Sequence, residues 1–175
     1  MEEKRDARGL TEAEAIARYR SRNYPKPAMT ADIAIFARQA DQLQVLLIRR
    51  KGHPYLGKLA LPGGFANENE PIEQTAAREL EEETGVSGLP VKLVGVYSAP
   101  GRDPRGWVVS VVYMAVAEAE KLQVQAGDDA AEVLWAQIEP QGESIVLRQN
   151  GRILPLAELA FDHVQILRDA LKSVM

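Results

Sequence analysis

Runs of apolar residues along the chain predict several strands. Segments rich in β-branched and aliphatic residues, bounded by glycine, proline or polar residues, are typical of strands. The predicted strands are 30–37, 43–50, 91–98, 107–117 and 132–136, and the apolar segment 59–62 leads into a double glycine. Asn150-Gly151 separates two further runs, 144–147 and 152–154, which favours a type I′ hairpin. Trp107 and Trp135 fall within strand patterns, so we expect both in the core.

Three segments carry helix signals. Thr11, followed three residues later by Glu14, matches a capping box that opens a helix ending near residue 22. Pro71 suits the first position of a helix and Gly85 the position just past its end, so a second helix is predicted over 71–84. The last helix is predicted over 156–173, with one apolar face formed by Ala160, Val164, Leu167 and Leu171.

These elements predict one layered domain. Strands combined with helices near the start, the middle and the end of the chain are typical of an α/β or α+β layered fold. A chain of 175 residues is long enough to bury one core, and no repeat or linker divides it. We therefore expect residues 1–175 to form a single domain, with 1–28 as an N-terminal helix and extension and 156–173 as a closing helix.

The composition excludes several classes of function. The chain has no cysteine, which rules out disulfides, thiolate nucleophiles and cysteine-based zinc sites. Its net charge of −4 gives no general attraction to nucleic acid or to an anionic membrane. The first residues lack the apolar core of a signal peptide, and no apolar run is long enough to span a bilayer. We expect a cytoplasmic protein without nucleic-acid or membrane partners.

Residues 63–86, GGFANENEPIEQTAARELEEETGV, concentrate negative charge just after the double glycine. This stretch contains seven of the 25 acidic residues of the chain and a single basic residue, Arg78. At about 100° per residue, Glu79, Glu82 and Glu83 fall within an arc of roughly 100° on the predicted helix, whereas Glu81 points elsewhere. At a separation of about 6 Å and an effective dielectric constant of about 20, each pair of these charges repels by about 3 kcal/mol.

A divalent cation relieves such repulsion. Clustered carboxylate oxygens suit magnesium or manganese, and the peptide carbonyls at Gly63-Gly64 can add a ligand. The alternative is an ordinary solvated helix face, because runs of charged residues are mostly surface features. The spacing argues against that alternative. The fixed positions of the Nudix box are all matched here, by Gly64, Glu70, Arg78, Glu79, Leu80, Glu82, Glu83, Gly85 and Val86.

On these residues the sequence resembles a Nudix hydrolase. The resemblance implies an α/β/α sandwich with a mixed sheet and metal-dependent hydrolysis of a nucleoside diphosphate linked to another group. It also implies Mg²⁺, with Mn²⁺ as a substitute, because such an ion neutralises charge on the pyrophosphate and lowers the pKa of a bound water. By position, Arg78 would orient a glutamate, and Glu70 would support the turn from loop to helix. The implied metal ligands are Glu79, Glu82, Glu83 and the carbonyl of Gly63.

The resemblance leaves the general base open, because Nudix enzymes differ in where it comes from. Glu83 and Glu79 are the first candidates. The alternative is an acid on a nearby loop or strand, namely Asp128, Asp129 or Glu132. An ordinary turn and strand start explains these three acids equally well.

A second likeness concerns the substrate. The segments LLIRRKGHPYLGKLALPGGF, SAPGRDPRG and AGDDAAEVLW resemble, in this order, the branch of Nudix proteins that handles ADP-ribose. The resemblance implies hydrolysis of ADP-ribose to AMP and ribose 5-phosphate. Basic residues in two loops flank the box and suit a diphosphate, and an aspartate between two of them can accept hydrogen bonds from ribose hydroxyls. The candidate substrate-binding residues are Arg50, Lys58, Arg102, Asp103 and Arg105.

Two other interpretations stay open. One is a Nudix hydrolase for another nucleotide, such as a nucleotide sugar, NADH or a dinucleoside polyphosphate. The other is a non-catalytic module, since some relatives of this branch are regulators that sense ADP-ribose and bind DNA through an added winged-helix domain. The segment after Glu139 is expected to form a hairpin and one helix, too little for that domain, and the intact box favours catalysis. Similar enzymes are commonly side-by-side dimers, so we expect a homodimer.

Overall fold

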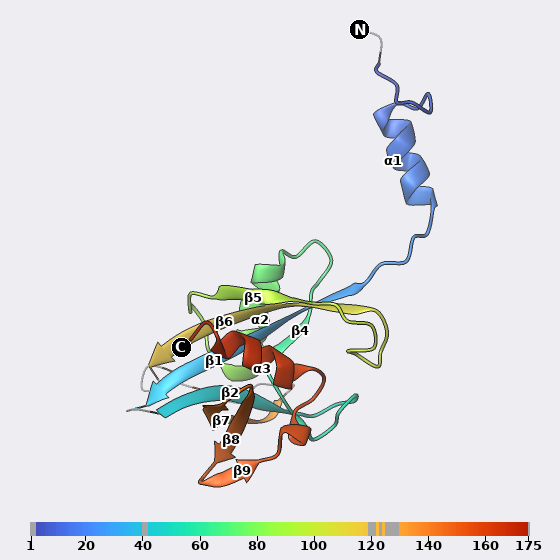
Figure 1. Cartoon of the computed structure of the whole chain (residues 1–175). Helices are drawn as coiled ribbons and strands as arrows, with labels where there is room; N and C mark the ends of the chain where they lie inside the picture. Colours follow the sequence, from blue (N-terminus) through green and yellow to red (C-terminus); the bar gives the residue numbers. More distant parts are fainter. Residues whose placement is uncertain (1–2, 40–41, 119–121, 123, 125–129, 175) are drawn as a thin grey trace.

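One mixed β-sheet organises the computed structural model, which describes residues 3–39, 42–118, 122, 124 and 130–174. The strand order is β5-β6-β1-β2-β7-β8-β9, with β3 added to β2 and β4 added to β1 (Figure 1). β1 and β6 run parallel, whereas the other pairs are antiparallel. The strands are β1 (Ala28–Gln39), β2 (Gln42–Arg50), β3 (Leu59–Ala60), β4 (Gly63–Phe65), β5 (Lys92–Tyr97), β6 (Val108–Glu118), β7 (Ala130–Gln141), β8 (Ser144–Gln149) and β9 (Arg152–Leu154). The helices are α1 (Glu12–Ser21), α2 (Ile72–Thr84) and α3 (His163–Leu171), with a 3₁₀ turn, η2, at Leu156–Glu158.

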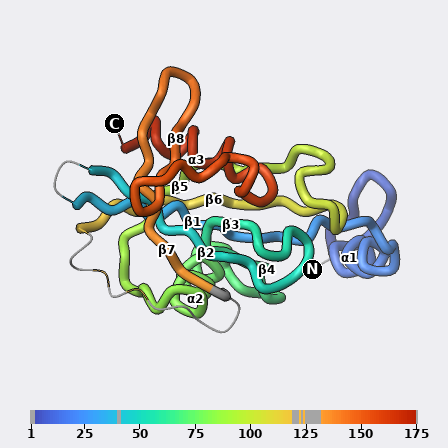
Figure 2. Tube along the Cα trace, turned by 90° about the horizontal axis from the view of Figure 1, so that it is seen from below, coloured from blue at the N-terminus to red at the C-terminus, as the bar shows by residue number. Residues whose placement is uncertain are grey.

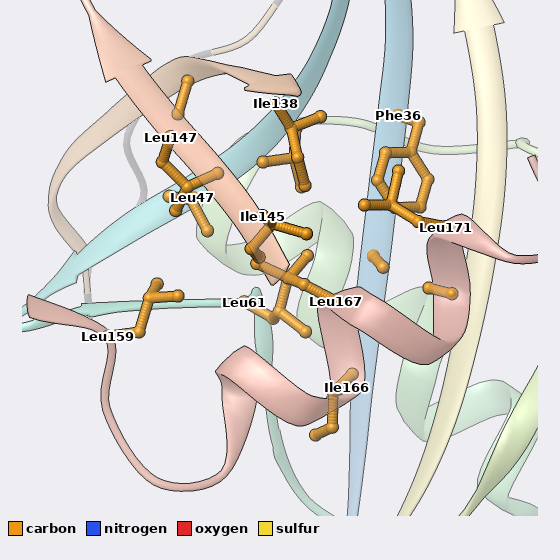
Figure 3. Packing of buried hydrophobic residues seen from close by; sticks show 14 of the residues in the cluster. Phe36, Leu47, Leu61, Ile138, Ile145, Leu147, Leu159, Ile166, Leu167 and Leu171 are labelled. Atoms are coloured by element: carbon orange, nitrogen blue, oxygen red, sulfur yellow. The ribbon is translucent and has the colours of Figure 1, made fainter. Parts of the chain in front are cut away.

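Helices α2 and α3 cover opposite faces of this sheet (Figure 2). Successive side chains of a strand point to opposite faces, and β1 is buried on both. Ile33 of β1 packs in one cluster with Leu80 of α2. Phe36 points the other way and belongs to the larger cluster that contains Leu167 of α3 (Figure 3). The predicted α/β/α arrangement with a mixed sheet is therefore confirmed.

Helix α1 stands apart from the sheet. The Thr11 side chain accepts the Glu14 backbone N–H, and the Glu14 carboxylate accepts the Thr11 N–H at 2.8 Å, so the predicted capping box is confirmed. No residue of α1 is buried, and an extended segment leads from it to β1 (Figure 1). Among the described residues, no helix is long and apolar enough to cross a membrane.

Helix α2 begins and ends close to the predicted residues. Pro71 is the N-cap rather than the first helical residue, so the prediction differs by one position. Gly85 ends the helix with φ 72°, a left-handed conformation that glycine adopts without steric cost, and its N–H donates to the Glu81 carbonyl at 2.8 Å. Both ends of the acidic helix are thus fixed by local sequence.

The predicted closing helix over 156–173 is wrong in its first part. The chain instead forms the short turn η2, and α3 begins only at His163. The Ala160 N–H donates to the Leu59 carbonyl at 2.7 Å, and Leu159 forms a parallel bridge with Leu59, so this segment pairs with β3. That long-range pairing outweighs the local helix signal and brings residues 159–163 beside the double glycine.

Trp107 is not a core residue, contrary to the prediction. It lies just before β6 and is 58% exposed. Ala28–Val108 is the outermost pair of the β1–β6 ladder, so Trp107 lies at the end of the sheet rather than within it. Trp135, in contrast, is partly buried and packs against the α2 side of the core.

Candidate metal and substrate site

Two glycines let the short strand β4 lie between β1 and helix α2. A Cβ atom on Gly63 would lie 2.3 Å from the Ala31 carbonyl oxygen. A Cβ atom on Gly64 would lie 2.4 Å from the Glu79 carboxyl group. Real Cβ atoms do not approach other atoms this closely, so a side chain on Gly63 would push β4 away from β1, and a side chain on Gly64 would displace the Glu79 carboxyl group. The double glycine therefore places bare backbone against the acidic face of α2.

Glu83 is the buried member of the acidic face. Its carboxylate accepts the Gly63 N–H at 2.8 Å, and the residue is only 7% exposed. Burial raises the pKa of Glu83 to about 8, and the charges of Glu79 and Asp32 add to this shift, although the Gly63 hydrogen bond opposes it. At neutral pH the metal-free carboxyl group therefore holds a proton in most molecules.

Arg78 ties the rest of the acidic face together. It donates two hydrogen bonds to Glu70, one to Glu79 at 2.6 Å and one to Glu82 at 3.0 Å. A further bond reaches the Phe65 carbonyl. These carboxylates raise the pKa of Arg78, and the Arg78 hydrogen bonds, with the Asn67 N–H, lower the pKa of Glu70 to about 2. Glu70 thus stays ionised at the turn from the loop into α2.

The glutamates fit a divalent cation after a modest rearrangement. Within the described residues, no three acidic or histidine side chains already converge on one point, because Arg78 holds Glu79 and Glu82. The Glu82 side chain is 59% exposed, so it can rotate at little cost. Glu81 next to it is exposed as well, and it lines neither pocket at the site. Carboxylate oxygens on one helix face are the donors that Mg²⁺ and Mn²⁺ prefer.

A pocket of about 590 Å³ opens in front of this face. Glu79, Glu83 and Arg78 line one wall, and Arg50 and Lys51 at the end of β2 line another. The pocket therefore combines predicted metal ligands with cations, which suits a diphosphate bridged to a metal ion. Arg50 is the predicted substrate-binding residue that this pocket contains.

A smaller pocket, of about 60 Å³, adjoins the first through Arg50 and the double glycine. Its lining includes three predicted substrate-binding residues from the loop 99–106, namely Arg102, Asp103 and Arg105. The Arg102 side chain is only 4% exposed and forms a bidentate ion pair with Asp162 at 2.6 and 2.8 Å. Asp103 is buried and accepts three side-chain hydrogen bonds from Arg105. In this arrangement each arginine of the loop already has a carboxylate partner.

Two other predicted residues, Lys58 and Glu132, line neither pocket. Lys58 donates to the Ala157 carbonyl and pairs with Glu158, each at 2.9 Å, so it holds the C-terminal segment. Glu132, an alternative general base, pairs with Arg49 at 2.9 Å across β2 and β7. The other two alternatives, Asp128 and Asp129, lie outside the described residues. A role for Lys58 in substrate binding stays a prediction.

The sequence did not identify a polar group behind the double glycine. Asp32 of β1 accepts a hydrogen bond from the Ser110 hydroxyl and lies 3.9 Å from Nε2 of His163. Nδ1 of His163 accepts the Leu61 N–H at 2.9 Å, and burial lowers the pKa of this imidazole, so His163 is neutral with its proton on Nε2. The signal in the sequence for this buried polar group is Asp32, an aspartate inside an otherwise apolar strand.

Comparisons with known proteins agree with this geometry. A protein-family model, the NUDIX domain, matches residues 26–149. The chain belongs to the Nudix family. A protein named ADP-ribose pyrophosphatase from Methanocaldococcus jannaschii is 35% identical over 169 residues, which cover 97% of this chain and 86% of that protein. An ADPR responsive transcriptional repressor, NtrR, from Acinetobacter baylyi is 35% identical over 157 residues, covering 89% of this Nudix chain and 57% of the repressor.

Solved structures give the same family. A MutT/nudix family protein from Enterococcus faecalis superposes with a TM-score of 0.82 at 40% identity, covering 95% of this chain and 70% of that one. The Nudix domain of NrtR from Shewanella oneidensis, solved with ADP ribose, gives a TM-score of 0.75 at 32% identity. That match covers 95% of this chain and all of the other.

The raised pKa of Glu83 predicts how the stability of the metal-free protein depends on pH. In the unfolded chain this carboxyl ionises near its ordinary value of 4.5, and in the folded protein near 8. Between these values the folded state binds the extra proton, so the Glu83 contribution to the free energy of unfolding is fully present below pH 4.5 and is lost as the pH rises through 8. The expected slope reaches about 1.4 kcal/mol per pH unit.

Urea unfolding in EDTA at several pH values between 5 and 8 measures this dependence. Glu83→Gln cannot titrate, so the difference between parent and variant isolates this group from other ionisable residues. The same pH dependence in both proteins would show that Glu83 ionises near its ordinary pKa.

Proposed function

We propose that this Nudix protein hydrolyses ADP-ribose to AMP and ribose 5-phosphate with Mg²⁺ as the cofactor. The observation that carries the proposal is the pocket that combines Glu79 and Glu83 with the cations Arg50 and Lys51. Water adds to one phosphorus of the diphosphate, and the bridging P–O bond breaks. Each product keeps one phosphate, so AMP and ribose 5-phosphate are formed whichever phosphorus the water attacks.

The glutamates of α2 would hold the metal. Mg²⁺, or Mn²⁺ as a substitute, would bind Glu79, Glu82 and Glu83 with the Gly63 carbonyl, and it would neutralise phosphate charge and lower the pKa of a bound water. Arg78 would keep Glu79 oriented through their 2.6 Å contact. Glu83 and Glu79 remain the first candidates for the general base because both line the pocket, whereas Glu132 pairs with Arg49 outside it.

Similarity supports ADP-ribose as the substrate. The relative from Methanocaldococcus jannaschii carries the name ADP-ribose pyrophosphatase and aligns over nearly the whole of this chain. The Shewanella oneidensis domain was solved with ADP ribose. Nucleotide sugars, NADH and dinucleoside polyphosphates are the alternatives within the same reaction class, since the diphosphate and its metal ion are common to all of them.

A sensor of ADP-ribose is the second candidate. The repressor from Acinetobacter baylyi supports it, because the matched region of that protein is similar to this chain. That relative extends well beyond the match, since only 57% of it is covered. The complete acidic face of α2 favours catalysis, because binding alone does not require three glutamates whose mutual repulsion must be offset.

Turnover by the purified protein tests the proposal directly. With Mg²⁺ and a panel of ADP-ribose, ADP-glucose, NADH and diadenosine tetraphosphate, we expect the highest kcat/KM on ADP-ribose, with AMP and ribose 5-phosphate as products on chromatography. EDTA should stop the reaction, and added Mg²⁺ should restore it, because the carboxylates alone cannot neutralise the phosphate charge. Full activity in excess EDTA contradicts the metal-assisted reaction, and tight binding of ADP-ribose without products supports the sensor instead.

Two neighbouring glutamates offer a matched test of the metal site. Glu82→Gln removes a ligand charge without changing shape. It should lower kcat by at least roughly 10- to 100-fold, which is the loss typical of changing a residue that only supports a metal ligand. Glu81→Gln makes the same chemical change one residue earlier, on the other side of the helix, and should be nearly silent. Steady-state kinetics at saturating Mg²⁺, with thermal unfolding as a control for folding, compares them. Equal damage by both substitutions contradicts the placement of the metal.

We also propose that the protein is a homodimer. Ile16 and Tyr19 of α1 are exposed apolar or aromatic residues, and so are Leu93 and Val96 of the edge strand β5. Unpaired sheet edges and exposed apolar side chains favour association with another chain. Light scattering after size-exclusion chromatography should give twice the 19.3 kDa of one chain. A mass of one chain at high protein concentration contradicts this assembly.

A further inference from the structure

Two aromatic residues beside the smaller pocket have positive backbone φ angles. The φ angle is 61° at Tyr55 and 53° at Phe161. In the described part of the chain, the other non-glycine residues with positive φ are Asn69 and Asn150, and asparagine tolerates this conformation. For bulky side chains it is an outlier that persists only where the surrounding structure enforces it, and such outliers cluster at functional sites.

Contacts from distant parts of the chain hold these two residues. The rings of Tyr55 and Phe161 meet edge to face, with 4.8 Å between their centroids. The Tyr55 carbonyl accepts the Lys58 N–H at 3.0 Å within the loop after β2. The bond from the Ala160 N–H to the Leu59 carbonyl fixes the residue just before Phe161. The Tyr55 ring therefore contacts the Phe161 ring, and pairing with β3 fixes the backbone just before it.

The Phe161 ring also contacts two arginines. The guanidinium carbon of Arg50 lies 5.0 Å from the ring centroid, and that of Arg105 lies 5.6 Å from it. Arg105 lies in addition 4.5 Å from the centroid of Phe65. The face of an aromatic ring carries negative charge density and attracts such cations. One ring thus brings together two positive groups, one from the end of strand β2 and one from the loop 99–106.

These two positive groups lie where the two pockets meet. Arg50 lines both pockets, whereas Arg105 and Phe161 line the smaller one. Burial lowers the pKa of Arg50 most, and the positive charge of Arg105 lowers it further, because the two guanidinium groups repel each other. The Arg50 Nε–H donates to the Pro54 carbonyl at 2.9 Å, and Asp103 holds Arg105 at 2.6 Å. A bound anion would relieve the repulsion between them.

We propose that Phe161 is a positioning residue for the substrate diphosphate. Its ring holds the guanidinium groups of Arg50 and Arg105 together at the junction of the pockets, so that both meet the phosphates without further ordering. Only the identity of the nucleotide rests on the proposed function, because the same arginines would serve any nucleoside diphosphate derivative. Because Phe161 acts through binding, its loss should raise KM and leave kcat nearly unchanged.

Two substitutions separate the ring face from its bulk. Phe161→Leu keeps an apolar side chain but removes the aromatic face, and Phe161→Tyr keeps that face. We expect Phe161→Leu to raise KM for ADP-ribose about tenfold, the scale of a contact worth about 1.4 kcal/mol. Phe161→Tyr should stay close to the parent. Calorimetric titration with ADP in EDTA should show the same tenfold loss of affinity, because this readout needs neither metal nor turnover.

Tyr24→Leu, in the segment between α1 and β1, makes the same kind of change at a residue that lines neither pocket, and it is expected to leave KM and ADP affinity unchanged. The substrate panel on the parent protein reports on the proposed function, and the variants are then compared on whichever nucleotide the parent prefers, so the two hypotheses fail separately. Phe161→Leu with the KM and ADP affinity of the parent overturns the positioning role. So does Phe161→Tyr if it is as impaired as Phe161→Leu.

The backbone angle gives a second readout. Phe161→Ala and Phe161→Gly both remove the ring, but only glycine adopts φ 53° without strain. We expect the same raised KM in both variants and a higher thermal unfolding midpoint for Phe161→Gly, the reverse of the usual order. A higher unfolding midpoint for Phe161→Ala would show that the backbone is not strained at this position, and it would contradict the idea that the fold enforces φ 53° in order to place the ring.

Discussion

The close approach of strand β4 to helix α2 is the constraint on which the site depends. The Gly63 N–H reaches the Glu83 carboxylate at 2.8 Å, and the missing side chain of Gly64 leaves room for the Glu79 carboxyl group. A methyl group at either glycine would occupy space that backbone or carboxyl atoms already fill. On Gly63 it would push β4 off β1 and so disturb the Glu83 hydrogen bond, and on Gly64 it would displace the Glu79 carboxyl group. The glycines and the glutamates are therefore one structural unit.

Without a metal ion, the negative charge of the acidic face is offset in two ways, and a cation can reverse both. Arg78 offsets Glu79 and Glu82 through direct ion pairs, and Glu83 avoids ionisation because burial raises its pKa to about 8. Each repulsive pair would otherwise cost about 3 kcal/mol at an effective dielectric constant of about 20. A divalent cation competes with both arrangements, since it replaces the arginine as the counter-charge and displaces the proton. The fold therefore tolerates the clustered charge and keeps it available for a metal ion.

Local signals made much of this fold predictable, and long-range pairing explains the rest. Pro71 and Gly85 mark the ends of α2 because each acts through its own backbone, and Asn150-Gly151 forms its hairpin for the same reason. The Nudix box spans one loop and one helix, so its spacing can be recognised from the sequence alone. The break in the closing helix depends on Leu59, a hundred residues before Leu159, and no local pattern records it.

Long separation along the chain also explains why the sequence did not distinguish the roles of some candidate site residues. Arg102 and Arg105 look equivalent in the loop APGRDPRG, but Asp162 approaches only Arg102, and it does so from a segment 60 residues away. The position of Phe161 beside the pockets depends on the pairing of that segment with β3, which no local pattern indicates. Partners that come from other elements cannot be assigned from spacing, whereas Arg105 and Asp103, two residues apart, form a contact that spacing allows.

The magnitudes then separate the roles of the two loop arginines. Breaking a buried ion pair by removing one partner costs about 3–5 kcal/mol, because the other charge is left buried without compensation. One hydrogen bond to a charged phosphate contributes about 1.5–3 kcal/mol. Arg102, 4% exposed and engaged by Asp162 through two bonds, therefore gains too little from a phosphate to leave its partner. The Arg105 side chain is 38% exposed, so its guanidinium can contact the substrate while it keeps its bonds to the buried Asp103. We infer that Arg102 fixes the loop to the start of α3 while Arg105 contacts phosphate. Arg102→Ala should then lower the unfolding midpoint and leave KM nearly unchanged. Arg105→Ala should raise KM, and it should also lower the midpoint, because it leaves the buried Asp103 carboxylate without its partner. Thermal unfolding and steady-state kinetics on both variants check this, and an unchanged KM in Arg105→Ala, or a KM raised only in Arg102→Ala, refutes it.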